Sequence, residues 1–510
     1  MIPRFRQRAA WCLANPVSAI RVIAGRTLGF MPRPPSRQQL WSKLAVLRPL
    51  LSCETEELTF GQRVLKKLLI ISLKIPDLHY RRVLVKLDAQ LASRSMSKVN
   101  PSKISRRGTL MMIGTLGPGG AERQLVATAK GLYANGEGNV SVACMDLSSK
   151  ANTFFLPELE AAGIITTIIG SETRDLLDCK TLDIIRKLPN ELRDVERYAA
   201  TLASRRPEIV HLWLDDINVK GGIAAALTGI ERIVISQRSL PPINFGLHQP
   251  YMREVYRWLV RRPGVKMINN SAAGAREYET WLGLPPGTIS VVHNGYAFDE
   301  GDLLHYRAAH GDYRRKCGID PKALVVGGVM RISEEKRPLL WLDIAAQIRQ
   351  TLPEVKFIIV GDGTMREVME VRASHSDLVG SVHFTGQLND AMGAIKDMDL
   401  LLLTSRAEGL PNVLVEAQIL GVPVVAMPVG GAPEAVDHGK SGWLLAGNDA
   451  KSSAEQIIRL LRDDKWRAEA AKHGPKFALA RFGMKRAIEE TLAAYGETMI
   501  TAQGAVHEPS

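Results

Sequence analysis

The sequence of 510 residues is 45% hydrophobic and 23% charged, a composition and length that suit two or three ordinary globular domains. Its net charge of +13 is concentrated at one end, because residues 1–107 hold 21 of the 66 Lys and Arg but only 5 of the 53 Asp and Glu. The rest of the chain, with 45 basic and 48 acidic residues, is close to neutral. This distribution argues against a nucleic-acid-binding core, so we expect no nucleic-acid partner.

The cysteines and the hydropathy pattern indicate in which cellular compartment the protein resides. Five widely spaced cysteines without a C-x-x-C pair suggest neither a zinc site nor a disulfide framework. No run reaches the roughly 18–20 apolar residues of a membrane-spanning helix, and the basic start is a poor secretory signal. We expect a cytoplasmic protein, either free or peripheral on the inner face of the membrane.

Residues 1–107 form a basic, mostly helical extension that ends in a linker rich in Ser, Lys and Arg. Two sets of apolar residues recur there at helical spacing, Leu40, Leu44, Leu47 and Leu51, then Val64, Leu68, Ile71 and Ile75. One interpretation is a small helical packing module. The other is an amphipathic surface for anionic lipid, because cationic faces beside apolar stripes suit a membrane interface.

From Gly108 the pattern changes to alternating strands and helices. Strands are predicted at 110–113, 140–145, 164–169, 209–213, 233–236 and 267–269, with helices at 121–135 and 193–204 among them. A second alternating series has strands at 324–329, 357–360, 382–385, 400–403, 424–426 and 442–444, and helices at 341–351 and 413–420. The α/β fold class therefore comprises two Rossmann-like, doubly wound domains facing across a cleft, which we place at 108–310 and 311–480, followed by a final segment at 481–510.

The most informative segment runs from Thr404 to Glu416. An apolar strand leads into a short loop that holds Glu408, and a helix that begins directly afterwards carries Glu416 eight positions on. The amino end of a helix favours phosphate, and carboxylates accept hydrogen bonds from sugar or ribose hydroxyls. The segment therefore predicts a nucleotide-sugar site.

Three further clusters follow predicted strands. The glycine turn 117–120 precedes a helix start, which lets backbone amides approach an anion closely. Arg331 and Lys336 could clamp a diphosphate, although a solvated charge run is the alternative interpretation. Gly361-Asp362-Gly363 is interpreted as a structural turn between a strand and a helix.

Together these residues resemble the retaining glycosyltransferases of family 4, which have the two-domain GT-B fold. The resemblance covers residues 108–500 and five motifs: Gly-Gly-Ala-Glu-Arg at 119–123, His-Asn-Gly at 293–295, Arg331 with Lys336, Gly-Asp-Gly at 361–363, and Glu408 with Glu416. Arg481-Phe482 and Tyr495 look like the final helix of the family, which crosses back onto the N-terminal domain. The resemblance implies that 108–310 is the acceptor domain and 311–480 the nucleotide-sugar donor domain.

The resemblance also implies roles for individual residues. Arg331 and Lys336 would hold the donor diphosphate and stabilise the leaving group, and with Glu408 they form the expected catalytic set. Glu416 would accept hydrogen bonds from the ribose. Glu408 would grip the transferred sugar and orient its anomeric carbon, aided by the backbone of its loop at Gly409, Leu410 and Asn412.

Gly119 and Gly120 would close over the phosphate or the sugar from the opposite domain. No cofactor is expected besides the nucleoside-diphosphate sugar as co-substrate, and no metal. The family implies a front-face displacement, in which the leaving diphosphate helps to deprotonate the acceptor, so Glu408 is not assigned as a covalent nucleophile. Base recognition is expected through the backbone at 386–388.

The sequence departs from the family pattern at one position. Many members place a His after the strand that here reads Val234-Ile235-Ser236, where this chain has Gln237-Arg238. Either His211, at the end of the preceding strand, or Arg238 replaces it as a substrate-binding residue, or His211 is structural. Asp397-Met398-Asp399 matches a metal-binding Asp-x-Asp motif, but it precedes its strand and is interpreted as a solvated strand entry.

The sequence therefore predicts a retaining, metal-independent hexosyltransferase that moves a sugar from a nucleoside-diphosphate sugar to a glycan or lipid-linked acceptor in polysaccharide biosynthesis. Two alternatives stay open. One is a phosphorylase or synthase on the same fold. The other is a non-catalytic scaffold of a polysaccharide assembly complex, with residues 1–107 as its docking arm.

Overall fold

The computed structural model describes residues 77–92, 108–136, 139–172, 174–245, 247–298, 300–308, 310–388 and 390–496. The helices predicted at 40–51 and 64–75 and the linker lie outside the described residues. The chain divides into two compact units, residues 1–92 with 246–255, and residues 93–245 with 256–510. In the part of the chain that the structure describes, no helix is long and apolar enough to cross a membrane.

The described part of the first unit is a helix over residues 77–92 and the segment 247–255. Tyr80, Leu84 and Leu87 recur on one helix face and are buried, which is the pattern of an amphipathic helix. Two ion pairs join the helix to the segment: Arg81 Nε lies 3.0 Å from Glu254 Oε2, and Arg253 Nη1 lies 3.1 Å from Asp77 Oδ2. This helix fits the helical extension predicted from the sequence.

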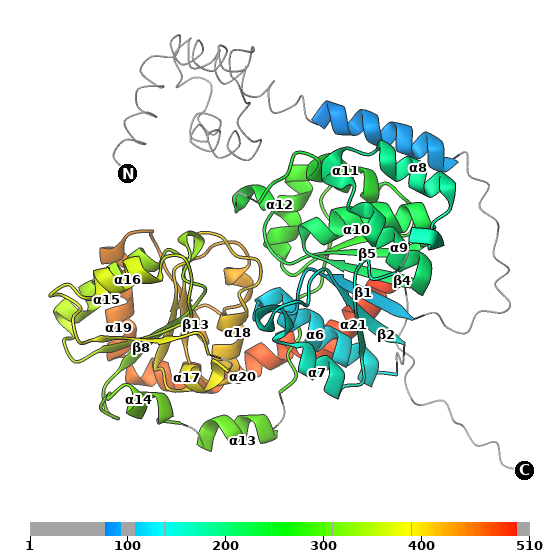
Figure 1. The fold of residues 1–510 in the computed structure, drawn as a ribbon. Helices are drawn as coiled ribbons and strands as arrows, with labels where there is room; N and C mark the ends of the chain where they lie inside the picture. Colours follow the sequence, from blue (N-terminus) through cyan, green and yellow to red (C-terminus); the bar gives the residue numbers. More distant parts are fainter. Residues whose placement is uncertain are drawn as a thin grey trace, which may run out of the picture. The chain divides into compact units, whose positions relative to one another are not determined.

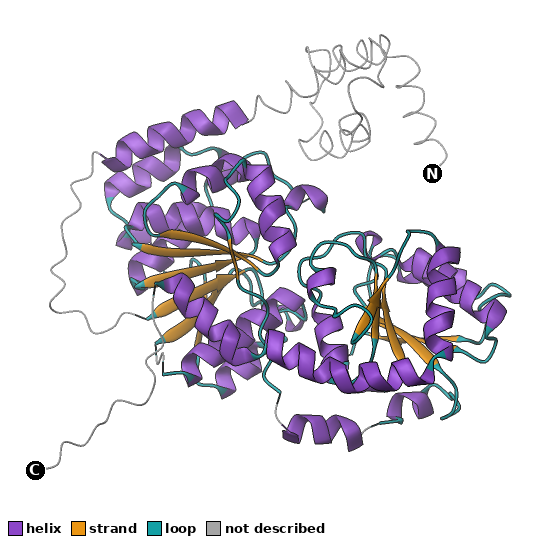
Figure 2. Ribbon diagram, turned by 180° about the vertical axis from the view of Figure 1, so that it is seen from behind, coloured by secondary structure: helices purple, strands orange, loops and turns teal. Residues whose placement is uncertain are grey.

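The first Rossmann-like domain is built on a seven-stranded parallel sheet in the order β3-β2-β1-β4-β5-β6-β7. Its strands are β1 (Thr109–Ile113), β2 (Val140–Cys144), β3 (Ile165–Ile168), β4 (Ile209–Trp213), β5 (Arg232–Gln237), β6 (Val265–Asn269) and β7 (Ser290–Val291). Its helices are α6 (Gly120–Ala134), α7 (Leu156–Ala161), α8 (Cys179–Lys187), α9 (Val195–Arg205), α10 (Asp215–Thr228), α11 (Met252–Val260) and α12 (Ala272–Leu282). Figure 2 shows helices on both faces of this sheet.

The second Rossmann-like domain has a six-stranded parallel sheet in the order β10-β9-β8-β11-β12-β13. Its strands are β8 (Val325–Val329), β9 (Lys356–Val360), β10 (Val382–Gly386), β11 (Leu400–Leu403), β12 (Val424–Ala426) and β13 (Gly442–Leu444). The helices in this part of the chain are α13 (Glu300–Ala308), α14 (Asp312–Lys316), α15 (Pro338–Thr351), α16 (Arg366–Ala373), α17 (Met392–Lys396), α18 (Asn412–Ile419), α19 (Ala450–Arg462), α20 (Asp464–Phe482) and α21 (Met484–Tyr495). The two doubly wound domains predicted from the sequence are thus confirmed.

Strand β11 shows why the apolar runs form central strands. Leu401 and Leu403 pack in the hydrophobic cluster on one side of the sheet, and Leu400 and Leu402 pack in the cluster on the other. Because a parallel strand covered on both faces has no solvent side, every residue of the run is apolar. β11 therefore ends at a fixed edge of the sheet, where the loop with Glu408 begins.

The last helix returns to the first domain. The chain passes Tyr296, whose backbone N–H donates to Phe482 O at 2.8 Å and whose carbonyl accepts from Met484 N at 2.9 Å. Helix α21 then packs against α6, β5 and β6, and Figure 1 shows its red ribbon beside α6. The crossover expected from Arg481-Phe482 and Tyr495 is therefore observed.

The interpretation of Asp397-Met398-Asp399 as a solvated strand entry is wrong. Asp397 is fully buried and accepts hydrogen bonds from the backbone N–H groups of Gly311, Tyr313 and Arg314 at 2.5, 2.7 and 3.2 Å. Asp399 accepts from Arg314 Nη2 and from Val325 N, both at 2.7 Å. The two carboxylates cap α14 and fasten it to the start of the second sheet.

Candidate functional site

The loop between β11 and α18 brings Glu408 to Lys336. Lys336 Nζ and Ser405 Oγ both donate to Glu408 Oε1 at 2.5 Å, and Glu408 is buried. Lys336 closes the short helix η7 (Glu334–Lys336), and its carbonyl accepts from Thr404 Oγ1 at 2.9 Å. The loops after β8 and β11 are thereby fixed to each other, so the predicted Lys336 and Glu408 form one unit.

Arg331 lies on the same loop as Lys336, directly after β8. Its side chain is exposed and makes no hydrogen bond or ion pair with any described residue. Burial raises the pKa of Glu122, on the first turn of α6, and the charge of Arg331 partly offsets that rise. Arg331 is therefore a cation available to an anionic ligand at the carboxyl end of β8.

Glu416 is paired with a residue that the sequence analysis did not assign. Glu416 is 3% exposed, and its carboxylate forms an ion pair with Arg123, from the Gly-Gly-Ala-Glu-Arg motif at the start of α6. Burial raises the pKa of Glu416 and the charge of Arg123 opposes the rise, while Glu416 raises the pKa of Arg123. Helices α6 and α18 of the two Rossmann-like domains are thus joined by opposite charges.

Asn412, the first residue of α18, contacts two segments of the first domain. Its Oδ1 accepts from Tyr296 Oη at 2.6 Å and from the Asn294 amide, and its Nδ2 donates to Gly120 O at 3.2 Å. A Cβ on Gly120 would lie 2.8 Å from Asn412 Nδ2, whereas a Cβ on Gly119 would meet only the Glu122 carboxylate. Gly120 therefore permits the close approach of the two helix starts.

Gly409 lies against the backbone of the first domain. A Cβ on Gly409 would be 2.7 Å from both Arg238 O and Asn270 Oδ1, so no larger residue fits there without displacement. The side chain of Leu410 packs in the hydrophobic core of the second domain. Of the expected sugar-binding loop, Leu410 thus offers only its backbone to a ligand.

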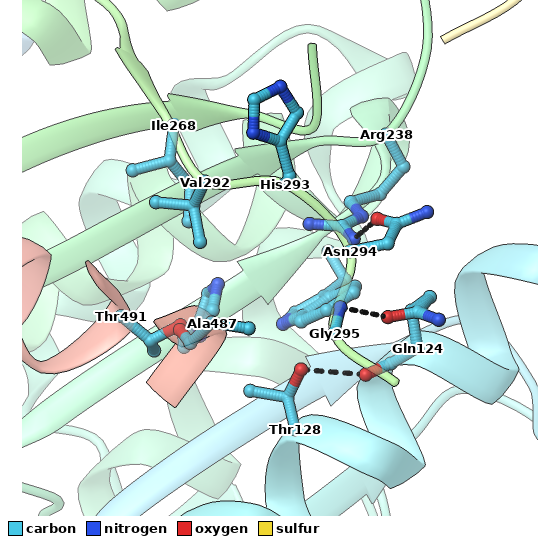
Figure 3. Close-up of a pocket in the computed structure, with 12 residues that line it drawn as sticks. Gln124, Thr128, Arg238, Ile268, Val292, His293, Asn294, Gly295, Ala487 and Thr491 are labelled. Carbon is cyan, nitrogen blue, oxygen red and sulfur yellow. Dashed lines mark hydrogen bonds between the residues drawn. The ribbon is translucent and has the colours of Figure 1, made fainter. Parts of the chain in front are cut away.

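His211 and Arg238 line one small pocket with Asn294 and Gln124 (Figure 3). His211 is buried and its Nδ1 hydrogen-bonds Tyr495 Oη at 2.8 Å, which ties β4 to α21. Burial, followed by the charge of Arg238, lowers the pKa of His211 to about 3, so the imidazole is neutral at neutral pH. This contact gives His211 a structural role in holding the last helix.

Among the described residues, no group of three or more His, Cys, Asp or Glu side chains is placed to hold a metal ion.

Comparison with known sequences assigns the family. The profile for "Glycosyltransferase Family 4" matches residues 118–300, and the profile for "Glycosyl transferases group 1" matches residues 310–477. The chain belongs to glycosyltransferase family 4. The resemblance drawn from the five motifs is confirmed.

Relatives of this family-4 chain include two curated bacterial proteins. It is 30% identical over 380 residues to the Vi polysaccharide biosynthesis protein VipC/TviE of Salmonella typhi, a match that covers 68% of the chain but only 65% of that protein. It is 25% identical over 294 residues to the UDP-Gal:alpha-D-GlcNAc-diphosphoundecaprenol alpha-1,3-galactosyltransferase of Escherichia coli, covering 56% of the chain and 73% of that enzyme. The chain thus spans less than two thirds of the length of the first relative.

Solved structures support the fold. Anabaena Alr3699/HepE in complex with UDP has a TM-score of 0.61 at 22% identity, covering 76% of this chain and 99% of that one. A TarM variant of S. aureus has a TM-score of 0.57 at 12% identity, covering 76% of this chain and 100% of that one. At these identities the likeness shows the GT-B fold alone.

Glu434 is a residue of this family-4 site that the sequence analysis missed. It ends the short helix η8 (Ala432–Glu434) of the second domain and accepts from Ala272 N and Ala273 N, both at 2.8 Å, at the start of α12 in the first. His293 Nε2 lies 3.0 Å from its Oε2. Burial raises the pKa of Glu434, but the hydrogen bonds from His293 and the two amides outweigh it and lower the pKa.

In the sequence, the feature that could have pointed to Glu434 is the pair of glycines, Gly430 and Gly431, shortly before it. Gly430 has a φ of +53°, and a Cβ there would lie 1.9 Å from Glu408 O. A Cβ on Gly431 would lie 2.3 Å from Gly409 O. The glycines let the loop after β12 pack on the loop that holds Glu408, so Gly-Gly-Ala-Pro-Glu at 430–434 belongs to the site.

Proposed function

We propose that the chain is a retaining glycosyltransferase that moves a sugar from a nucleoside-diphosphate sugar to a glycan or lipid-linked acceptor in polysaccharide biosynthesis. The observation that carries this proposal is the cluster of Arg331, Lys336 and Glu408 on the loops that follow β8 and β11. Lys336 is paired with a carboxylate that suits sugar hydroxyls, and Arg331, a second cation for a diphosphate, lies on the same loop at the strand ends where α/β folds bind ligands.

Each residue has a proposed task. Arg331 and Lys336 neutralise the diphosphate as it leaves, so the reaction does not require a metal ion. An ammonium group has three N–H donors, and Lys336 can therefore keep Glu408 oriented while it binds a phosphate oxygen. Glu408, with the backbone of Gly409 and Leu410, holds the sugar, and Glu416 accepts from the ribose.

The proposed chemistry is a front-face displacement. The bond between the anomeric carbon and the diphosphate oxygen breaks, and the acceptor oxygen bonds to that carbon on the same face. The acceptor hydroxyl gives its proton to the departing diphosphate oxygen. Lys336 and Ser405 both donate to one oxygen of Glu408, which fixes the carboxylate, and its proposed task is to position the sugar without forming a covalent intermediate.

The relatives support the substrate classes. One is named for Vi polysaccharide biosynthesis, and another for galactosyl transfer from UDP-Gal to a diphosphoundecaprenol-linked acceptor. Anabaena HepE, which shares the fold, was crystallised with UDP and with UDP-glucose. We therefore take a nucleotide-sugar donor and a polysaccharide precursor as the proposed substrates.

We also propose that the basic extension contacts an anionic membrane surface. In the described helix at 77–92, Leu78 and Val85 are 51% and 63% exposed, and Arg82 and Lys86 are exposed beside them. The double variant Arg82→Glu, Lys86→Glu should pellet less with anionic vesicles than the parent protein, and neither should pellet with neutral vesicles. Equal pelleting of the two proteins would contradict a membrane contact. It would favour the alternative, in which the extension binds a partner in an assembly complex.

A thermal-shift panel tests the donor class. UDP-, GDP-, ADP- and dTDP-sugars are added to the full-length protein, because a ligand at 100 times its Kd stabilises the native state by about 2.7 kcal/mol. At least one nucleotide sugar should raise the Tm, and radiolabelled sugar from that donor should then appear in a glycan or lipid fraction. A panel without any stabilising nucleotide sugar would contradict the proposal.

A further inference from the structure

No carboxylate among the described residues forms an ion pair with the positively charged guanidinium of Arg238. This residue directly follows β5, its Cζ lies 4.3 Å from the centre of the Trp213 ring, and Nη1 donates to Ser236 Oγ at 3.3 Å. Nη2 donates to Asn294 Oδ1, the bond drawn in Figure 3. Burial lowers the pKa of Arg238 to about 9. The group is thus held by neutral partners and an aromatic face while its charge is desolvated.

The acids around it are already engaged. Glu408 is paired with Lys336, Glu416 with Arg123, and Glu434 with His293 and two backbone amides. Arg331 likewise has no ion-pair partner among the described residues, but it belongs to the second domain and is assigned to the diphosphate. Arg238 therefore marks a second anion-binding position, on the first domain.

Unused donors surround this position. A guanidinium carries five N–H groups, and two of those on Arg238 are engaged, which leaves three for a ligand. Arg238 Nε and Trp213 Nε1 are both buried N–H groups, and neither has a hydrogen-bond partner among the described residues. A water molecule can satisfy a buried N–H, but it cannot neutralise a desolvated cation. An anionic partner satisfies both requirements.

The position lies on the sugar side of the site. The Arg238 carbonyl is where the Gly409 loop touches the first domain, since a Cβ on Gly409 would be 2.7 Å from it. Asn294, which binds the Arg238 guanidinium, also hydrogen-bonds Asn412 at the start of α18. Arg238 thus borders the loop proposed to hold the transferred sugar and lies on a different domain from the diphosphate residues.

We propose that Arg238 binds a carboxylate or phosphate group carried by the acceptor or by the transferred sugar, separate from the donor diphosphate. This inference rests on the proposed glycosyl transfer and adds that one of the two carbohydrate substrates is anionic near the bond that forms. The Trp213 ring and Asn294 fix the plane of the guanidinium, so its free edge binds a planar anion in a defined orientation.

The test compares neutral and anionic probes by calorimetry on the full-length protein, the variant Arg238→Gln and the control Arg232→Gln. Arg232 starts the same strand, β5, and pairs with Glu208 away from the site. The donor arm titrates UDP-glucose against UDP-glucuronate and GDP-mannose against GDP-mannuronate. The acceptor arm adds methyl glucoside, methyl glucuronide or glucose 1-phosphate to protein saturated with UDP or GDP.

The parent protein and the control should prefer the anionic probe in one arm by about 10-fold or more, the value of a hydrogen bond to a charged group. Arg238→Gln should lose that preference while its affinity for UDP or GDP stays within about 2-fold, and the arm affected identifies which substrate carries the anion. Its Tm without ligand should be equal or higher, because the change removes an uncompensated desolvated charge, whereas a purely structural role predicts a lower Tm.

Equal affinity for neutral and anionic probes in both arms, or an unchanged preference in Arg238→Gln, would overturn the proposal. If none of UDP, GDP, ADP and dTDP binds the parent protein, the proposed function fails together with this inference. Normal nucleotide binding without any preference for the anion removes only the assignment of Arg238.

Discussion

The contact of Glu434 with helix α12 makes a sharp prediction about how the two Rossmann-like domains hold together. Ala272 N and Ala273 N donate to the Glu434 carboxylate at 2.8 Å each, whereas Gly274 N donates to Ser271 Oγ of its own domain at 3.0 Å. The first turn of α12 is therefore capped partly from the second domain and partly from within the first. Glu434→Ala removes only the part that comes from the second domain.

The size of the effect follows from these bonds. A hydrogen bond to a charged group contributes about 1.5–3 kcal/mol, and water compensates in part for an exposed helix amide. We expect Glu434→Ala to weaken the contact by about 2 kcal/mol, because loss of a helix cap typically costs about 1 kcal/mol and here two bonds are lost. Since 1.4 kcal/mol is a factor of ten, the contact should open roughly 30-fold more often.

Residue-resolved hydrogen exchange measures this opening. The amides of Ala272 and Ala273 should lose protection in Glu434→Ala, while Gly274 keeps its own because Ser271 is unchanged. The matched variant Glu434→Gln retains one carbonyl acceptor. The protection of Ala272 and Ala273 in this variant should therefore lie between that in the parent protein and that in Glu434→Ala. Unchanged exchange of Ala272 and Ala273 in Glu434→Ala would refute the account of this contact.

The same contact has a defined pH dependence. The pKa of Glu434 in the folded protein is lowered from the usual 4.5 by its hydrogen bonds. A depressed carboxyl pKa stabilises the folded state above the unfolded pKa, and this stabilisation disappears as the pH falls through the folded pKa. The difference in amide protection between the parent protein and Glu434→Ala should be constant at pH 6–8 and vanish at acid pH below the folded value.

Three other substitutions test separate parts of the site and fold. Glu408→Gln should reduce sugar transfer by about 100-fold, the effect of losing one preorganised charged contact, with the Tm nearly unchanged; full turnover would contradict its role. Asp397→Ala should lower the free energy of unfolding in urea by about 3 kcal/mol, because three backbone N–H groups lose their acceptor, and a loss below about 1 kcal/mol would argue against that cap. Arg123→Gln should raise the pKa of buried Glu416 further, so its loss of Tm should be larger at pH 8 than at pH 5; an equal loss at both would show that the ion pair does not matter.

The strand pattern and the donor cluster could be read from the sequence because both depend on local order. A run such as Leu400–Leu403 fits only a strand covered on both faces, and side chains that follow neighbouring strands meet at the same sheet edge. Lys336 and Glu408 follow β8 and β11, which are paired in the sheet. Their meeting was therefore predictable.

The contacts between distant segments could not be read in the same way. Glu416 was assigned to the ribose, but its partner Arg123 cannot be identified until α6 and α18 are placed together. Asp397 was misjudged because the amides it binds belong to α14, more than 80 residues earlier in the chain. The packing of the Leu410 side chain in the core of the second domain is another such contact, and it leaves the expected role of the Leu410 backbone untouched.

The central claim, that the loops after β8 and β11 bind a nucleoside diphosphate, is tested most directly by calorimetric titration of the stabilising nucleotide sugar into the parent protein and Arg331→Gln. The Arg331 side chain has no partner among the described residues, so the substitution should leave the fold intact. The account predicts a Kd raised about 10- to 100-fold, the value of a charge-assisted contact to phosphate. The same Kd for both proteins would contradict it.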